Sequence, residues 1–169
     1  MLPIDPPLAK ARLTGSACGP HVANDLTDHV ADLVDDMFDA EGKTAQVKAA
    51  RMVLAYDREN IDAHLVLAEH AGSMAEAIAL LREAVRIGNR VWAPALKGNQ
   101  RVEWWDESGT RPFMRAILAY GQALADHRQP DQAKLCFKAL LKMQPEDSLQ
   151  ARGELEKLGE APKSGLGRR

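Results

Sequence analysis

The chain has 169 residues, 46% of them hydrophobic and 27% charged, a composition typical of a folded globular domain rather than a disordered chain. Its formal net charge of −2 lacks the surplus of Lys and Arg that binding to nucleic-acid phosphates requires. No apolar run approaches the roughly 18 residues needed to cross a bilayer and the first residues resemble no signal peptide, so we expect a cytoplasmic protein outside the membrane.

The first part of the chain changes character near residue 24. Residues 1–23 carry prolines and glycines without any period, which predicts an irregular N-terminal arm. From Asp25 onward, apolar residues recur at helical spacing with aspartates between them, which predicts an amphipathic helix ending near Gly42. The apolar positions are Leu26, Val30, Leu33, Met37 and Phe38, and the acidic ones are Asp28, Asp32, Asp35, Asp36 and Asp39.

Three more helices are predicted in quick succession. The apolar spacing places them over residues 43–57, 60–71 and 73–88. Ser73 and Glu76 form a capping box at the start of the third, and we expect Gly88 to end it in a left-handed turn. Because the connections are short, consecutive helices are expected to pack antiparallel.

Residues 89–111 break this rhythm with prolines, glycines and two tryptophans, which predicts an irregular insertion. Three further helical patterns follow, each with proline in the first turn, where the missing N–H is tolerated. They span residues 112–127, 130–143 and 145–158. The predicted helical domain thus covers residues 24–158, and residues 159–169 form a short basic C-terminal tail.

One stretch fits a known helical repeat. The tetratricopeptide signature W-x2-L-G-x2-Y, then A-x3-F, then P marks two packed helices in a unit of about 34 residues. Residues of matching size stand at Ile117, Tyr120, Gly121 and Leu124, and then at Ala133, Phe137, Leu140 and Pro145. Small Gly121 and Ala133 would let the two helices approach closely, while Tyr120 and Phe137 fill the space beside them. The stretch therefore resembles the tetratricopeptide-repeat (TPR) family.

An earlier stretch is a weaker copy, with a turn three residues shorter. Its matching positions are His64, Leu67, Ala68 and Ala71, followed by Ala77, Leu81 and Ala84. The helix before it falls into phase through Ala50, Val53 and Arg58, which gives two complete pairs and a half pair. The resemblance implies an all-α fold in which antiparallel helix pairs stack as a short TPR-like solenoid, interrupted by the tryptophan-containing insertion.

A narrower resemblance involves two motifs. A group of TPR-like proteins related to the suppression-of-tumorigenicity family carries T-R-P-Y-M-R-A before one helix pair and N-P-x-D-N-Q after it. Here the two motifs read Thr110-Arg-Pro-Phe-Met-Arg-Ala116 and Gln144-Pro-Glu-Asp-Ser-Leu-Gln150, so phenylalanine replaces tyrosine and Gln144 and Ser148 replace the asparagines. The resemblance covers roughly residues 44–155 and implies a helical-repeat fold rather than a particular activity.

Six residues are candidates for a binding face. In helical repeats of this kind, residues beside the packing stripe of each first helix would line a concave surface. These are Asp62, Leu65 and Glu69 in the earlier pair and Arg115, Leu118 and Gln122 in the later one. They do not supply the paired Lys and Asn with which some TPR proteins hold a peptide carboxylate. An ordinary solvated helix surface is the alternative.

The insertion adds three further candidates. Trp104 and Trp105 are adjacent large aromatics that either pack against the helices or contact a partner. Arg111 and Arg115 could hold a phosphate or carboxylate of a ligand. The alternative that we favour is that the two arginines pair with Asp106, Glu107 or Asp147 and fix the insertion.

No metal or cofactor site is predicted. The aspartates and His29 of the first helix are better explained as a solvated face, and Cys18 and His21 lack a second ligand pair at zinc spacing. The only other cysteine, Cys136, lies in a helical pattern, so no disulfide framework is indicated. Phosphate-binding, dinucleotide-binding and nucleophile-elbow motifs are absent from the sequence.

Two functions are consistent with these patterns. The first is a protein-interaction module, an adaptor or scaffold that binds a segment of another protein in the groove of the helical repeat or through its acidic first helix. The second is an enzyme or enzyme regulator whose site gathers His64, His70, Glu69 or Arg115 from separate helices. Since no catalytic motif is present, we expect the first. The sequence leaves the identity of the partner and the oligomeric state open.

Overall fold

The computed structural model describes residues 20–98 and 101–159, and the side chains from Thr27 onward. Within these residues the chain is helical and contains no strand, which confirms the all-α prediction. The helices are α1 (Pro20–Asp39), α2 (Lys43–Tyr56), α3 (Ile61–Glu69), α4 (Met74–Val91), α5 (Ala93–Leu96), α6 (Arg111–Asp126), α7 (Pro130–Met143) and α8 (Ala151–Lys157), with a short 3₁₀ helix η1 (Ser108–Thr110) before α6. Most of the predicted arm, and the tail beyond Gly159, lie outside the described residues.

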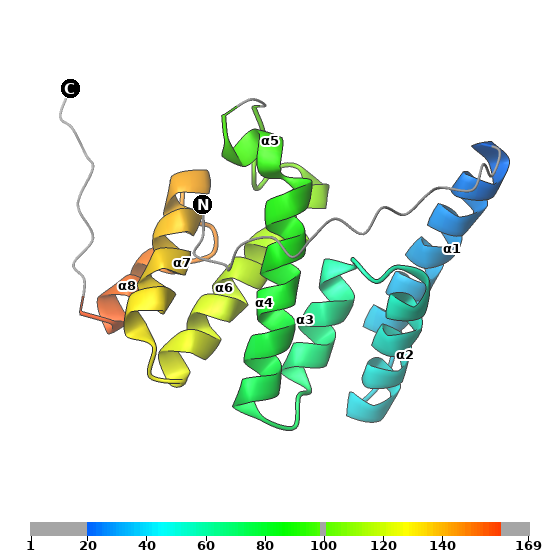
Figure 1. Ribbon diagram of the computed structural model, residues 1–169, viewed down its shortest axis with the longest axis horizontal. Helices are drawn as coiled ribbons and strands as arrows, with labels where there is room; N and C mark the ends of the chain where they lie inside the picture. Colours follow the sequence, from blue (N-terminus) through cyan, green and yellow to red (C-terminus); the bar gives the residue numbers. More distant parts are fainter. Residues whose placement is uncertain (1–19, 99–100, 160–169) are drawn as a thin grey trace, which may run out of the picture.

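The long helices lie side by side in chain order, from α1 at one end to α8 at the other (Figure 1). Each packs mainly on its neighbours in the chain, and α4 packs directly on α6 across the insertion. Two further contacts skip one long helix, α1 with α3 and α3 with α6. As a result α1, α3 and α6 line one side of the array, and α2, α4 and α7 line the other side.

Apolar side chains form two cores that meet at α3. The larger core joins α3, α4, α6, α7 and α8, and it buries the whole packing stripe predicted on α6 and α7. The smaller one consists of Met37, Ala50, Val53 and Ala63, from α1, α2 and α3. Within α3, Ala63 belongs to the smaller core and Ala68 to the larger. Helix α3 therefore contributes to both cores.

Three helix boundaries differ from the predicted ones. Helix α1 begins at Pro20, inside the segment expected to be irregular. Helix α8 begins at Ala151 rather than Pro145, because Asp147 and Gln150 have positive φ angles of 61° and 57°, which an α-helix does not contain. The Asp147 carboxylate accepts hydrogen bonds from the backbone N–H of Ala151 at 2.6 Å and of Arg152 at 3.1 Å. Pro145 instead lies in the turn after α7.

The third difference concerns Gly88, which does not end its helix. Helix α4 continues to Val91, and Gly88 is buried inside it against the ring of Phe113. A Cβ atom at residue 88 would lie 1.9 Å from Cδ2 of Phe113, so only glycine allows this approach of α4 and α6. The predicted start of α4 is confirmed: the Ser73 hydroxyl accepts a 3.2 Å hydrogen bond from Glu76 N, while Gly72 N donates to the Glu76 carboxylate at 2.8 Å.

The insertion, predicted to be irregular over residues 89–111, is partly helical: α4 extends into it as far as Val91, and α5 and η1 lie within it. It folds back onto the end of α4. Trp104 meets Trp92 edge-on at 5.9 Å between ring centroids and lies 6.2 Å from the ring of Phe113. The buried Thr110 hydroxyl lies within hydrogen-bond distance of the backbone carbonyl groups of Trp104 and Glu107 and shares its one hydrogen between them, which fixes η1 before α6. Trp104 and Trp105 are thus both partly buried against the larger core, which is the first of the two alternatives considered for them.

Candidate functional site

A groove of about 470 Å³ lies along α3 and α6. Its floor consists of small and aliphatic side chains from three helices: Leu65, Val66, Ala68, Ala77, Leu81, Ala119 and Ala123. Two larger apolar side chains stand at its edge, Phe38 from α1 and Met74 from the first turn of α4, and both are exposed. The groove has the volume of a site for a small ligand or a few side chains of a peptide.

Four charged residues complete the lining of the groove, namely Asp62, Glu69, Asp126 and Arg115. At one end, the Arg115 guanidinium donates a 2.8 Å hydrogen bond from Nη2 to Oδ1 of Asp62. The Asp62 side chain is only 17% exposed, and its burial raises the pKa of the carboxyl group above the usual value, against the opposing effect of Arg115. Asp62 is the second residue of α3 and Arg115 is the fifth residue of α6, so the pair lies near the N-terminal ends of both helices. Both helices pack on α4 and run opposite to it, so they run in the same direction along the groove (Figure 1).

The other end of the groove is acidic. Glu69 is the last residue of α3 and Asp126 is the last residue of α6, and both are exposed. Within residues 20–98 and 101–159, neither carboxylate makes an ion pair with a Lys or Arg. One end of the groove is therefore neutralised by an internal ion pair, while the other carries two carboxylates open to solvent.

The structure brings four of the predicted binding residues together, namely Asp62, Leu65, Glu69 and Arg115. The other two residues predicted on the binding face, Leu118 and Gln122, do not line the groove. Leu118 is half-buried against the larger core, and Gln122 donates a 3.1 Å hydrogen bond to Glu154 of α8. Burial alone would raise the pKa of the Glu154 carboxyl group. The hydrogen bonds from Gln122 and Lys157 outweigh it, and the pKa of this group is lowered.

Sequence reasoning missed part of the α6 wall, namely Ala119, Ala123 and Asp126. These residues follow Arg115 at steps of four, four and three, and so they lie on the same helix face as Arg115. The predicted residues Leu118 and Gln122 follow it at steps of three and four, on a stripe turned toward α8. Phe38 was assigned to the packing face of α1, and no sequence signal placed it at the groove.

The insertion residues make local contacts instead of lining the groove. Arg111 donates from Nε to the backbone carbonyl of Trp105 at 2.9 Å, and its guanidinium lies 5.5 Å from the centre of the Trp105 indole ring. Since Arg115 pairs with Asp62, the predicted pairing of both arginines with Asp106, Glu107 or Asp147 is wrong. Arg111 fixes the insertion through a carbonyl group and an aromatic ring.

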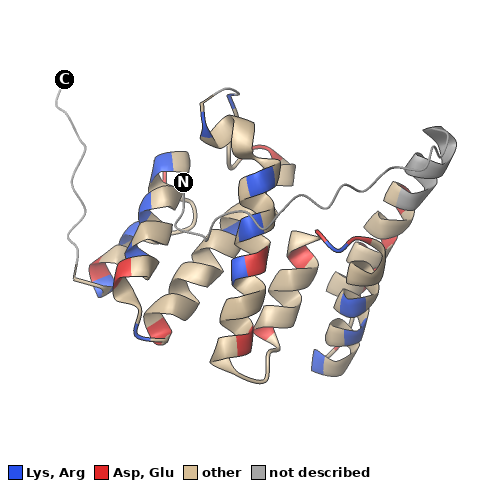
Figure 2. Cartoon of the chain, in the orientation of Figure 1, with Lys and Arg blue, Asp and Glu red and all other residues tan. Residues whose placement is uncertain are grey.

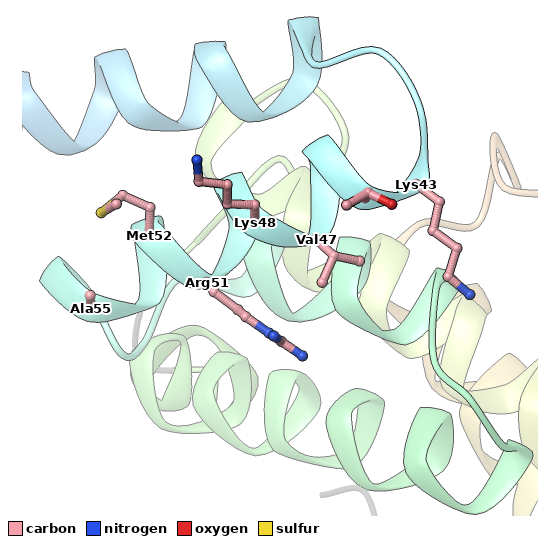
Figure 3. A pocket seen from close by; sticks show the side chains of 7 residues that line it. Lys43, Val47, Lys48, Arg51, Met52 and Ala55 are labelled. Atoms are coloured by element: carbon pink, nitrogen blue, oxygen red, sulfur yellow. The ribbon is translucent and has the colours of Figure 1, made fainter.

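A second hollow, of about 550 Å³, lies on α2 (Figure 3). Its lining comes from one helix alone, with the cationic side chains Lys43, Lys48 and Arg51 beside Val47 and Met52. Figure 2 shows the resulting row of basic residues along α2. Because one helix supplies only one wall, a ligand here would stay largely in solvent, and the two-helix groove is the better candidate site.

No family model, curated protein or solved structure matches the chain. Its function is therefore inferred from the residues and geometry of the groove. No helix in the described part of the chain has the length and apolar character needed to span a bilayer.

The histidines proposed for an enzyme site each have a separate local partner. His70 Nε2 lies 2.6 Å from the Gln46 side-chain oxygen, which ties α3 to α2, and His64 Nε2 lies 3.2 Å from the Arg58 carbonyl oxygen. Burial raises the pKa of Cys136 to about 12, so this thiol stays protonated at neutral pH and is a poor nucleophile. The described residues contain no group of three His, Cys, Asp or Glu side chains that could hold a metal ion.

Proposed function

We propose that the chain is a protein-interaction module that binds a short segment of a partner protein in the groove between α3 and α6. The observation that carries this proposal is an apolar floor with exposed Phe38 and Met74 at its edge. Exposed apolar side chains around a groove with charged ends are typical of a surface that a partner covers.

We also propose that the helices form a TPR-like array, in which α3 and α6 are the first helices of two successive pairs. Three observations support it: α3 packs on α4, α6 packs on α7, and α3 meets α6. In addition, Ala68 and Gly121, which occupy the same position in the two copies of the repeat signature, are both buried. In such an array the first helices line the binding surface, which agrees with the position of the groove.

The enzyme alternative receives less support from the same residues. Glu69 and Arg115 line the groove, but Arg115 is paired with Asp62, and His64 and His70 are engaged with Arg58 and Gln46. Within the described residues, no hydrogen bond or ion pair joins any two of the four proposed catalytic groups. A catalytic base and its partners need mutual contacts of hydrogen-bond length, so a binding role fits these side chains better.

The test compares two exposed apolar residues of similar exposure. Phe38, at the edge of the groove, is 50% exposed, and Leu135, on α7 and outside the groove, is 46% exposed. The full-length protein is first bound to an array of short peptides of random sequence, which supplies the binders for the comparison. Phe38→Ser should weaken their binding about tenfold, as expected when the burial of one large apolar side chain is lost. Leu135→Ser should leave it unchanged.

The control is the melting temperature of each variant. Because both side chains are about half exposed, we expect both variants to melt close to the parent protein. Equal binding by the parent protein and the Phe38→Ser variant would place the binding surface elsewhere, with the basic row on α2 as the next candidate.

A further inference from the structure

The charges of the groove identify the kind of segment that it accepts, an inference that rests on the proposed function. Three carboxylates line the groove, and its only guanidinium is already paired with one of them, Asp62. The unpaired carboxylates, Glu69 and Asp126, both line the groove toward its opposite end, since α3 and α6 run in the same direction from the Asp62–Arg115 pair. The groove therefore has a neutral end, an apolar middle and a negative end.

The backbone adds to the negative charge at that end. The C-terminal end of a helix carries the negative pole of its dipole, and both α3 and α6 end toward this part of the groove, at Glu69 and Asp126. Neither helix has a Lys or Arg in its last turn to offset this pole. Arg128 follows α6 closely, but it is exposed and does not line the groove. A cation from a partner would thus meet two carboxylates and two helix ends of the same sign.

The apolar floor lies between the two ends. Leu65 stands between Asp62 and Glu69 on one face of α3, and the two acidic residues are separated by about 10 Å along the helix axis. Ala119 and Ala123 face it from α6 and leave room above the floor because their side chains are small. An apolar side chain seated here would lie within reach of a cationic neighbour at the acidic end.

We propose that the groove binds a segment of another protein that carries an apolar side chain close to a lysine or arginine. The apolar side chain lies on the floor beside Leu65, and the cation lies between Glu69 and Asp126. Both parts of the segment are needed, since an exposed carboxylate pair alone holds a cation weakly in water and the apolar floor alone sets no charge preference.

The test uses the peptide array together with charge-neutral variants of the full-length protein. Peptides that bind the parent protein should be enriched in Lys or Arg next to a large apolar residue. The double variant Glu69→Gln with Asp126→Asn should weaken their binding about fivefold to tenfold, because two exposed rim charges are lost. Raising the salt concentration to roughly 1 M should remove most of this difference.

The matched control is Glu41→Gln with Glu146→Gln, which changes the net charge by the same amount at two exposed residues outside the groove. This variant should bind the selected peptides like the parent protein. An equal loss of affinity in the control variant would show a general effect of net charge and would overturn the proposed cation site.

The remaining outcomes separate this inference from the proposed function. Binders that lack basic residues but are lost with Phe38→Ser would overturn the inference and keep the groove as a binding site. Binders that are insensitive to Phe38→Ser would overturn both. The chain also has basic residues of its own beyond Gly159. If replacement of Lys163, Arg168 and Arg169 by serine raises peptide affinity fivefold or more, the occupant is this segment and not a partner.

Discussion

Gly121 shows how a single missing side chain can set the distance between two helices. It lies on α6 against α7, where an added Cβ would be 2.6 Å from Cε1 of Phe137 and 3.1 Å from Cβ of Cys136. Phe137 is fully buried, so its ring cannot move aside into solvent. Gly121→Val should therefore lower the free energy of unfolding by about 1–3 kcal/mol, the usual cost of overpacking. Urea denaturation followed by circular dichroism measures this loss.

Gly153 on α8 supplies the control, because an added Cβ there meets no other atom within 4 Å. Gly153→Val should change the free energy of unfolding by less than about 0.5 kcal/mol. Similar losses for the two variants would contradict the contact described for Gly121.

The two buried glycines also show what the sequence could and could not predict. The role of Gly121 was predictable because the repeat signature fixes its position relative to Phe137. Gly88 carries no such signal: a glycine after a run of helical residues ordinarily ends a helix, and its reason for being buried is Phe113, a residue on a different helix. A contact between distant segments overrides the local preference, and a single sequence does not reveal it.

Trp104 and Trp105 are neighbours in the chain with different structural roles. Trp104 packs between Trp92 and Phe113, whereas Trp105, which is also partly buried against the larger core, has the Arg111 guanidinium over its ring. Trp104→Ala should lower the free energy of unfolding by about 3 kcal/mol, as for other large aromatics removed from a core. Trp105→Ala should lower it by about 2 kcal/mol, because a partly buried ring and its cation–π contact with Arg111 are both lost. Circular dichroism in urea distinguishes the two, and equal losses would contradict these assignments.

The Asp62–Arg115 pair links α3 to α6 and should make stability depend on pH. Because burial raises the pKa of Asp62 in the folded state, its contribution to stability is greatest below the unfolded value of about 3.8 and is lost as pH rises through the folded value. Loss of the Arg115 charge would raise the folded pKa further. Arg115→Met should thus lower the free energy of unfolding by about 1 kcal/mol at neutral pH and by much less near about pH 3.

The double variant Asp62→Asn with Arg115→Met controls for the lost side-chain packing of Arg115. With no buried carboxylate left, its free energy of unfolding relative to the Asp62→Asn protein should be the same at both pH values. A cost of Arg115→Met that is equal at neutral and acidic pH would show that the charge on Asp62 does not carry the effect.

Pairs such as this one limit how far a binding face can be predicted. The periodicity of α3 and α6 was enough to select Asp62, Leu65, Glu69 and Arg115, all of which line the groove. The sequence indicated the wrong partner for Arg115, an acidic residue of the insertion or Asp147, because its actual partner Asp62 lies on a helix that the insertion separates from α6. The choice between two adjacent stripes of α6 depended on where α3 and α8 pack, which the sequence of α6 alone does not contain.

The array as a whole is predicted to be unevenly stable. The α1–α2 end is held by a small core of four buried residues, whereas the larger core spans α3 to α8. Amide hydrogen exchange should therefore show α1 and α2 opening at a lower free energy than α6 and α7. Met37→Ala should lower protection in α1 and α2 while leaving α6 and α7 unchanged, and Leu124→Ala should lower it from α3 to α8. Uniform protection along the chain would contradict this division.

The groove crosses the boundary between these two cores, since Phe38 comes from α1 and the opposite wall from α6. A bound segment that touches both walls would hold the weaker end of the array against the stronger one. Occupancy and order in α1 are then linked reciprocally: binding would slow amide exchange in α1 and α2, and any change that loosens α1 would weaken binding by the same free energy. The stability of the amino-terminal helices would therefore contribute directly to the affinity for the partner.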